Sequence, residues 1–267
     1  MAQNDYNKDR IESFKKRVGF SKLVGVDGPD GVVANWAEMP NTLIYAKGKR
    51  IDSGQVYLLE PGLAKAKYVW KQGEDYLSVW VFVSGTGPSR AQERLLSLSS
   101  ETMMAKIPYE SGPAKLGDLS VRSPEPPFDV VMWVYRNVCV YVGTEVSARD
   151  VEPVAREIQR FMEAHHVSRL AYHLPVVDRV DVSARQIHVG DELKLSIILG
   201  KTTPLESVRT HFNEVGEHRL EVLSIQPLTA TYRAKTPGQT RIDIPVVDRK
   251  TLLSPPLSVT VDILPAR

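Results

Sequence analysis

Two short stretches of alternating side chains dominate the hydrophobic pattern of the chain. Residues 79–83 read Val-Trp-Val-Phe-Val, and residues 138–142 read Val-Cys-Val-Tyr-Val. Successive side chains of a β-strand point to opposite faces, so each stretch predicts a strand with valines on one face. The near-repetition predicts that the N-terminal part of the chain holds two copies of one structural unit.

The first copy continues from a hairpin into a helix. Residues 66–71 and 76–83 are rich in strand-forming side chains and flank a short loop with Gly73, which predicts a hairpin. Ser89 has Gln92 three residues later, the pattern of a capping box at the start of a helix. A helix from Ser89 has one apolar stripe, formed by Ala91, Leu95 and Leu98.

The second copy follows the same plan. Residues 130–135 and 138–142 flank Arg136 and Asn137, a two-residue loop in which asparagine tolerates a positive φ. Asp150 is the expected N-cap of the helix that follows. The apolar stripe of this helix consists of Val151, Val154, Ala155, Ile158 and Met162.

These patterns predict an α+β domain over residues 1–172. Two hairpin-helix units form an antiparallel sheet with both helices on one face, and a pseudo-twofold axis can relate the units. A further helix is expected over residues 8–18, where Ile11, Phe14 and Val18 share one face. Each unit alone exposes too much apolar surface, so we expect the two to share a core.

Residues 173–267 change in character and predict an all-β domain. Short strand-like runs alternate with turn signals, and proline recurs, which is typical of a β-sandwich. The expected strands cover residues 176–182, 192–199, 218–224, 230–234, 240–247 and 257–263.

Two motifs in this second part resemble bacterial immunoglobulin-like (Ig-like) domains. Residues 189–195 read Val-Gly-Asp-Glu-Leu-Lys-Leu, and residues 230–242 contain Tyr232 followed by the turn Pro237-Gly238. In those domains such a Val-Gly-Asp segment opens the second strand, and the tyrosine and turn lead into the penultimate strands. The resemblance implies an Ig-like β-sandwich that serves as a spacer or docking module, although this part of the chain lacks the cysteines of disulfide-bonded members.

Charge and cysteine content restrict the class of function. The net charge is +2 and is evenly spread, whereas a nucleic-acid-binding protein normally has a basic domain or stripe. Cys139 is the single cysteine and lies in an apolar strand, where it is expected to be a small buried hydrophobe. No apolar run reaches the length of about 18 residues that predicts a transmembrane helix.

The expected location is extracytoplasmic, either periplasmic or secreted, because Ig-like sandwiches are common there. The first residues are polar and do not form a signal peptide. A cytoplasmic location stays open.

Candidate catalytic and metal-binding groups follow no known pattern. The histidines at 165, 166, 173, 211 and 218 lack the spacing of zinc ligands. Residues 85–89 lie between a strand and a helix but match neither phosphate-binding glycine motif. The chain also lacks a G-x-S-x-G elbow. We therefore expect no cofactor, no metal and no catalytic residue, although triads that assemble across long sequence distances leave no such signal.

The aromatic side chains of the two repeated strands are the best candidate binding surface. Alternation places Tyr76, Trp80 and Phe82 on one strand face, and Tyr141 is the equivalent of Phe82 in the second copy. Small valines suit packing beneath helices, so the aromatic face is expected to point away from them. An open aromatic face can bind a protein or a carbohydrate. The alternative is that another part of the chain or a second subunit covers it.

The sequence thus favours a non-enzymatic binding or assembly protein of a bacterial extracytoplasmic system. The N-terminal sheet is the expected recognition surface. Two alternatives stay open: a hydrolase acting on a polymer with an accessory Ig-like domain, and a structural homo-oligomer whose aromatic face is the subunit interface. The identity of the partner and the oligomeric state leave no trace in the sequence.

Overall fold

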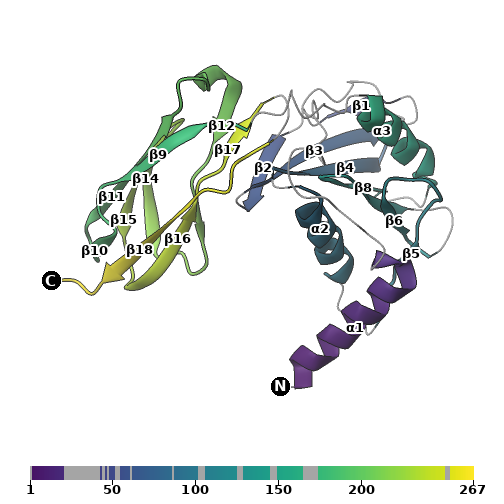
Figure 1. Cartoon of the computed structure of the whole chain (residues 1–267), viewed down its shortest axis with the longest axis horizontal. Coiled ribbons are helices and arrows are strands. Elements are labelled where there is room, and N and C mark those ends of the chain that lie inside the picture. Colours follow the sequence, from purple (N-terminus) through teal and green to yellow (C-terminus); the bar gives the residue numbers. More distant parts are fainter. Residues whose placement is uncertain are drawn as a thin grey trace. The chain divides into compact units, whose positions relative to one another are not determined.

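The computed structural model describes most of the chain: residues 2–20, 43, 46, 48–51, 55–60, 62–85, 87–101, 106–124, 129–144, 149–164, 174–249 and 253–267. Two compact units are present, the first of residues 1–57 and 65–172, the second of residues 58–64 and 173–267. The described part is mostly antiparallel β-sheet, with α-helices α1 (Ala2–Val18), α2 (Pro88–Ser100) and α3 (Glu152–Ala164) (Figure 1). Among these described helices, none is both long and apolar enough to cross a membrane.

The largest sheet has eight strands, in the order β1-β3-β4-β8-β7-β6-β5, with β2 also paired to β3. Its four long central strands include the two predicted hairpins, β3–β4 and β7–β8. The bounds are β1 (Lys49–Arg50), β2 (Gln55–Glu60), β3 (Leu63–Gln72), β4 (Asp75–Ser84), β5 (Glu110–Ser111), β6 (Leu119–Arg122), β7 (Val130–Tyr135) and β8 (Val138–Thr144).

The two near-identical strands are direct neighbours at the centre of this sheet. Strands β4 and β8 pair antiparallel, with Val81 opposite Val140, Trp80 opposite Tyr141, and Phe82 opposite Cys139. All the valines of both stretches are completely buried. The near-repeat therefore forms the central pair of the sheet, which agrees with a shared core for the two hairpins.

The two helices pack on opposite faces of the sheet, so the expectation that both cover one face is wrong (Figure 1). On the aromatic face, the Arg94 guanidinium of α2 lies 4.6 Å from the ring centroid of Phe82. On the valine face, Trp133 Nε1 donates a hydrogen bond to Gln159 Oε1 of α3 at 2.9 Å. Because α2 and α3 lie on opposite faces, the pseudo-twofold relation does not extend from the strands to the helices. Both faces of the sheet are apolar, and each is covered by one helix.

The local signals at the turns and helix starts differ from the expectations in two places. Helix α2 begins at Pro88 with Gly87 as N-cap, and no side chain caps it, so Ser89 is not the cap. Proline suits this position because its missing N–H would have had no helical partner. In the β7–β8 turn Arg136, not Asn137, has the positive φ, of 52°. Asn137 is instead buried and donates from Nδ2 to the Ser84 carbonyl oxygen at 2.8 Å.

The start of α3 and the end of α1 agree better with the sequence patterns. Asp150 Oδ1 accepts a hydrogen bond from the Glu152 backbone N–H at 2.9 Å. In α1, Phe14 and Val18 are buried. The histidines at 165, 166 and 173 lie outside the described residues.

The described residues from 174 onward form two four-stranded sheets and a two-stranded sheet. Their orders are β14-β15-β11-β9, β10-β18-β16-β13 and β12-β17. The bounds are β9 (Val177–Val182), β10 (Gln186–His188), β11 (Glu192–Leu199), β12 (Val208–Thr210), β13 (Asn213–Val215), β14 (Leu220–Gln226), β15 (Thr229–Ala234), β16 (Gly238–Asp243), β17 (Val246–Asp248) and β18 (Ser258–Leu264). Strands β10 and β18 pair parallel, whereas the other pairs are antiparallel.

One hydrophobic core lies between the two four-stranded sheets, an arrangement consistent with a β-sandwich. It combines side chains of both sheets, including Leu193 and Leu195 from β11 and Ile242 from β16. Tyr232 is also buried there, and its hydroxyl donates to the Phe212 carbonyl oxygen at 3.1 Å. Alternate residues of each strand enter this core, as the period of two in the sequence predicts.

Candidate functional site

The predicted aromatic surface forms a row of stacked side chains across the main sheet. The rings of Trp80 and Tyr141 are stacked, with centroids 4.7 Å apart. Lys65 Nζ, from β3 on the other side of β4, lies 3.9 Å from the Trp80 ring centroid. Because the ammonium and the tyrosine come from opposite flanking strands, both faces of the indole are occupied. The row therefore has no open indole face, and Lys65, Trp80 and Tyr141 are each half-buried.

A glycine makes room for this row. Gly143 follows Tyr141 by two positions and therefore lies on the same face of β8. A Cβ atom at position 143 would stand 2.7 Å from Tyr141 Cζ, closer than such contacts allow. The tyrosine ring thus lies along its own strand over the glycine, in position to stack on Trp80.

Phe82, at the next position of the aromatic face, is covered by helix α2. Its side chain is completely buried, with the Arg94 guanidinium over its ring. Cys139, opposite Phe82, is also completely buried, and burial raises the pKa of its thiol to about 12. Phe82 therefore belongs to the packed part of the aromatic face, while Trp80 and Tyr141 lie at its half-buried margin.

Tyr76 lies apart from the stacked row, at the start of β4. Lys71 Nζ is 4.9 Å from its ring centroid. A side-chain hydrogen bond with Tyr76 is the main cause that raises the pKa of Lys71. The four residues predicted from sequence thus separate into a stacked pair, a buried ring and a ring at the β3–β4 turn.

The aromatic face also gathers positive charge, which the sequence pattern of hydrophobic residues did not reveal. Lys65, Lys67 and Lys71 are separated by two and four positions along β3, so all three share the face of Trp80. Burial is the main cause that lowers the pKa of Lys65, followed by the charges of Arg94 and Lys67, while Glu101 acts in the opposite direction. Glu101 itself lies 3.6 Å from Arg94.

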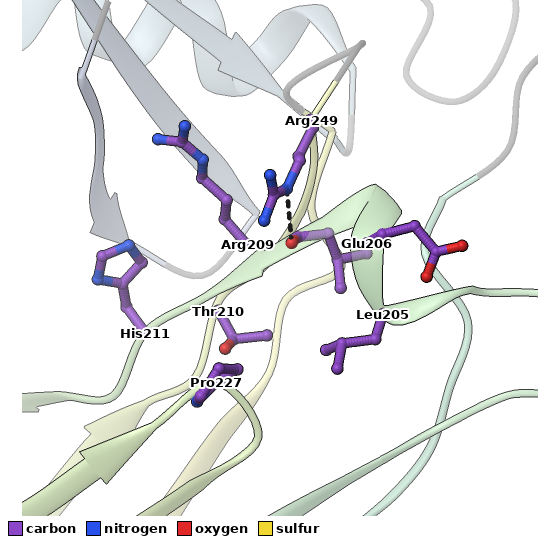
Figure 2. A pocket seen from close by; sticks show the side chains of 8 residues that line it. Leu205, Glu206, Arg209, Thr210, His211, Pro227 and Arg249 are labelled. Atoms are coloured by element: carbon purple, nitrogen blue, oxygen red, sulfur yellow. Dashed lines mark hydrogen bonds between the residues drawn. The ribbon is translucent and has the colours of Figure 1, made fainter.

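A second candidate site is an open pocket of about 490 Å³ in the second unit. It lies beside strand β12 and is lined by Leu205, Glu206, Val208, Arg209, Thr210, His211, Pro227 and Arg249 (Figure 2). The hydrophobic pattern gives no signal for this pocket, because β12 is only three residues long. Its lining comes from three separate parts of the chain, residues 205–211, Pro227 and Arg249, so no local motif marks it.

Within the described residues, three or more histidine, cysteine, aspartate or glutamate side chains nowhere gather as metal ligands would. Cys139 keeps its proton at neutral pH, since its pKa of about 12 lies far above 7. The interactions observed at the two candidate sites are cation–π contacts, ring stacking and hydrogen bonds.

Comparisons with known proteins give no assignment. No family model and no curated protein matches the chain. Among solved structures, a polysaccharide lyase has a TM-score of 0.25 and 8% identity, over 79% of this chain and 35% of that chain. The gamma-CGTase of alkalophilic Bacillus clarkii has a TM-score of 0.20 and 11% identity, over 79% of this chain and 26% of that chain. The chain spans only about a third or a quarter of these structures, and likenesses this weak carry no argument about fold or function.

Proposed function

We propose that this protein is a non-enzymatic binding or assembly component of a bacterial extracytoplasmic system. The sheet of the first unit is its recognition surface, and the second unit is an Ig-like spacer or docking module. The partner is an anionic carbohydrate polymer, held by the lysines of β3 beside the Trp80–Tyr141 stack.

One observation carries this proposal: the Lys65 ammonium rests on a half-buried Trp80 ring next to further cations of the same face. The lowered pKa of Lys65 reflects lost hydration together with the nearby charges of Arg94 and Lys67. An approaching anion stabilises such an ammonium. The stack also holds the lysine in place, so less side-chain entropy is lost when a partner binds.

The strand order of the second unit supports its Ig-like assignment. The sheet β14-β15-β11-β9 corresponds to strands D, E, B and A, and β10-β18-β16-β13 to A′, G, F and C. The motif residues fit this reading, since residues 192–195 lie in β11, the B strand, and Tyr232 lies in β15, the E strand. The extracytoplasmic location rests on this resemblance.

The test compares binding of polygalacturonate, an acidic polysaccharide, with binding of neutral dextran by calorimetry. Lys65→Met and Lys67→Met each remove a charge and keep an apolar stem. We expect each to weaken polygalacturonate binding about fivefold, corresponding to about 1 kcal/mol. Trp80→Ala is expected to weaken it further while the chain stays folded.

The matched control is Lys194→Met, the same change at an exposed position of β11 in the second unit. It should leave binding unchanged. Equal binding of dextran, or equal losses in the control and in Lys65→Met, would contradict the proposed surface. Unfolding of Trp80→Ala would show that the ring is a core element rather than a contact surface.

A further inference from the structure

The pocket of the second unit lies along an edge of strand β12. Ser207 and His211 stand at the two ends of β12 and form backbone hydrogen bonds toward the β17 side. The Arg249 N–H donates to the Ser207 carbonyl oxygen at 2.8 Å, and the His211 N–H donates to the Pro245 carbonyl oxygen at 3.2 Å. In an antiparallel pair the residues between such positions direct their backbone groups to the other side. Val208 and Thr210 therefore present theirs to the pocket. The 3.0 Å hydrogen bond from Arg249 Nε to the Val208 carbonyl oxygen agrees with this direction (Figure 2).

The charged side chains of the pocket favour an anion. Arg209 and Arg249 both line it, and guanidinium groups bind carboxylate and phosphate oxygens in pairs. In Figure 2 the carboxylate of Glu206 points away from both guanidinium groups. His211 adds a hydrogen-bonding ring. Partial burial, and secondly the charge of Arg209, lower the pKa of His211 below its ordinary value, which favours the neutral ring at pH 7.

The remaining lining is apolar. Leu205, Val208 and Pro227 lie along the pocket, and Leu205 is 48% exposed. An apolar side chain so exposed gains from contact with a ligand. The volume of about 490 Å³ falls in the range of small-molecule sites.

We propose that this pocket binds a small organic anion. Its charged group pairs with Arg209 and Arg249, and its apolar body packs against Leu205 and Pro227. This site is separate from the recognition surface of the first unit, and either can fail without the other.

The test uses phenyl phosphate and benzoate as probes on the full chain, followed by NMR chemical shifts and calorimetry. Benzyl alcohol has the same apolar body without the charge, and inorganic phosphate has the charge without the body. We expect both organic anions to bind more tightly than either of these two controls, and to shift resonances of residues 205–211.

Two variants separate a binding role from a structural one. Arg209→Gln removes one guanidinium group from the lining and should lower affinity about tenfold. Leu205→Ala shortens an exposed apolar side chain, so affinity should fall about threefold while stability stays nearly the same. Arg233→Gln and Leu223→Ala make the same changes at exposed positions of β15 and β14, and should leave affinity unchanged.

Several results would overturn the proposal. One is the absence of binding by both organic anions. Another is binding of benzyl alcohol as tight as that of benzoate, since it would leave the guanidinium groups without a role. A third is unchanged affinity in both Arg209→Gln and Leu205→Ala.

Discussion

Trp133 of β7 and Gln159 of α3 are joined by a buried hydrogen bond of 2.9 Å between the indole N–H and the amide oxygen. The bond ties the valine face of the sheet to the helix that covers it. Gln159→Met keeps the length of the side chain and removes the acceptor. The buried indole N–H then loses its partner, so we expect the free energy of unfolding to fall by about 1–3 kcal/mol, measured by urea denaturation.

A double-mutant cycle with Trp133→Phe isolates this bond. Because the two side chains act on each other, the double variant should lose less stability than the sum of the single variants. Strictly additive losses would mean that the hydrogen bond contributes nothing beyond packing.

Gly143→Ala should disturb the aromatic row. The new Cβ would stand 2.7 Å from Cζ and 2.9 Å from Cε1 of Tyr141, so the ring must move off its strand. We expect a loss of about 1–3 kcal/mol in stability and a changed near-ultraviolet circular dichroism signal from Trp80. In a Tyr141→Ala background the same change should cost little. An equal cost in both backgrounds would show that the glycine serves the backbone, not the ring.

The stability of the chain should depend on Cys139 at alkaline pH. Burial raises the pKa of this thiol from 9.0 to about 12 in the folded state. Above pH 9 the unfolded chain releases the proton and the folded chain keeps it, so stability is full below pH 9 and falls as the pH rises toward 12. The difference in the free energy of unfolding between wild type and Cys139→Ala removes the contribution of the other titrating groups. Between pH 8 and pH 10 the free energy of unfolding of the wild type should fall by about 1 kcal/mol more than that of the variant.

The same burial predicts a protected thiol. Ellman's reagent should react with Cys139 only at the rate at which the first unit opens, and rapidly in urea. A fast reaction of the native chain would contradict the closed packing of α2 over the aromatic face.

Strand β14 is an exposed apolar edge of its sheet. Among the described strands it pairs with β15 alone, and Val222 and Ile225 are 55% and 48% exposed. Such edges promote association between chains. Ile225→Lys should reduce concentration-dependent association in light scattering and change stability by less than about 0.5 kcal/mol.

Val176→Lys places the same charge on an equally exposed position outside β14 and serves as the control. It should leave association as in the wild type. If Ile225→Lys associates as strongly as the wild type, the β14 edge does not form the contact between chains.

Pattern alone determined the local elements of this protein. The alternation at 79–83 and 138–142 places valines on a buried face, and both stretches are strands with completely buried valines. This works because alternation is a property of the extended backbone itself and needs no knowledge of neighbours. The hairpin loops followed for the same local reason, although the positive φ fell on Arg136 and not on Asn137.

Tertiary structure decided which surfaces those elements share. Both faces of the central strands are apolar, so the pattern could not tell that α2 would cover Phe82 while α3 covers Trp133. The stack of Lys65 on Trp80 depends on the pairing of strands from distant parts of the chain, and so does the pocket around Thr210. The periodicity of side chains along one strand does not specify which distant strand pairs with it or in which register. In this protein that pairing places Lys65 against Trp80.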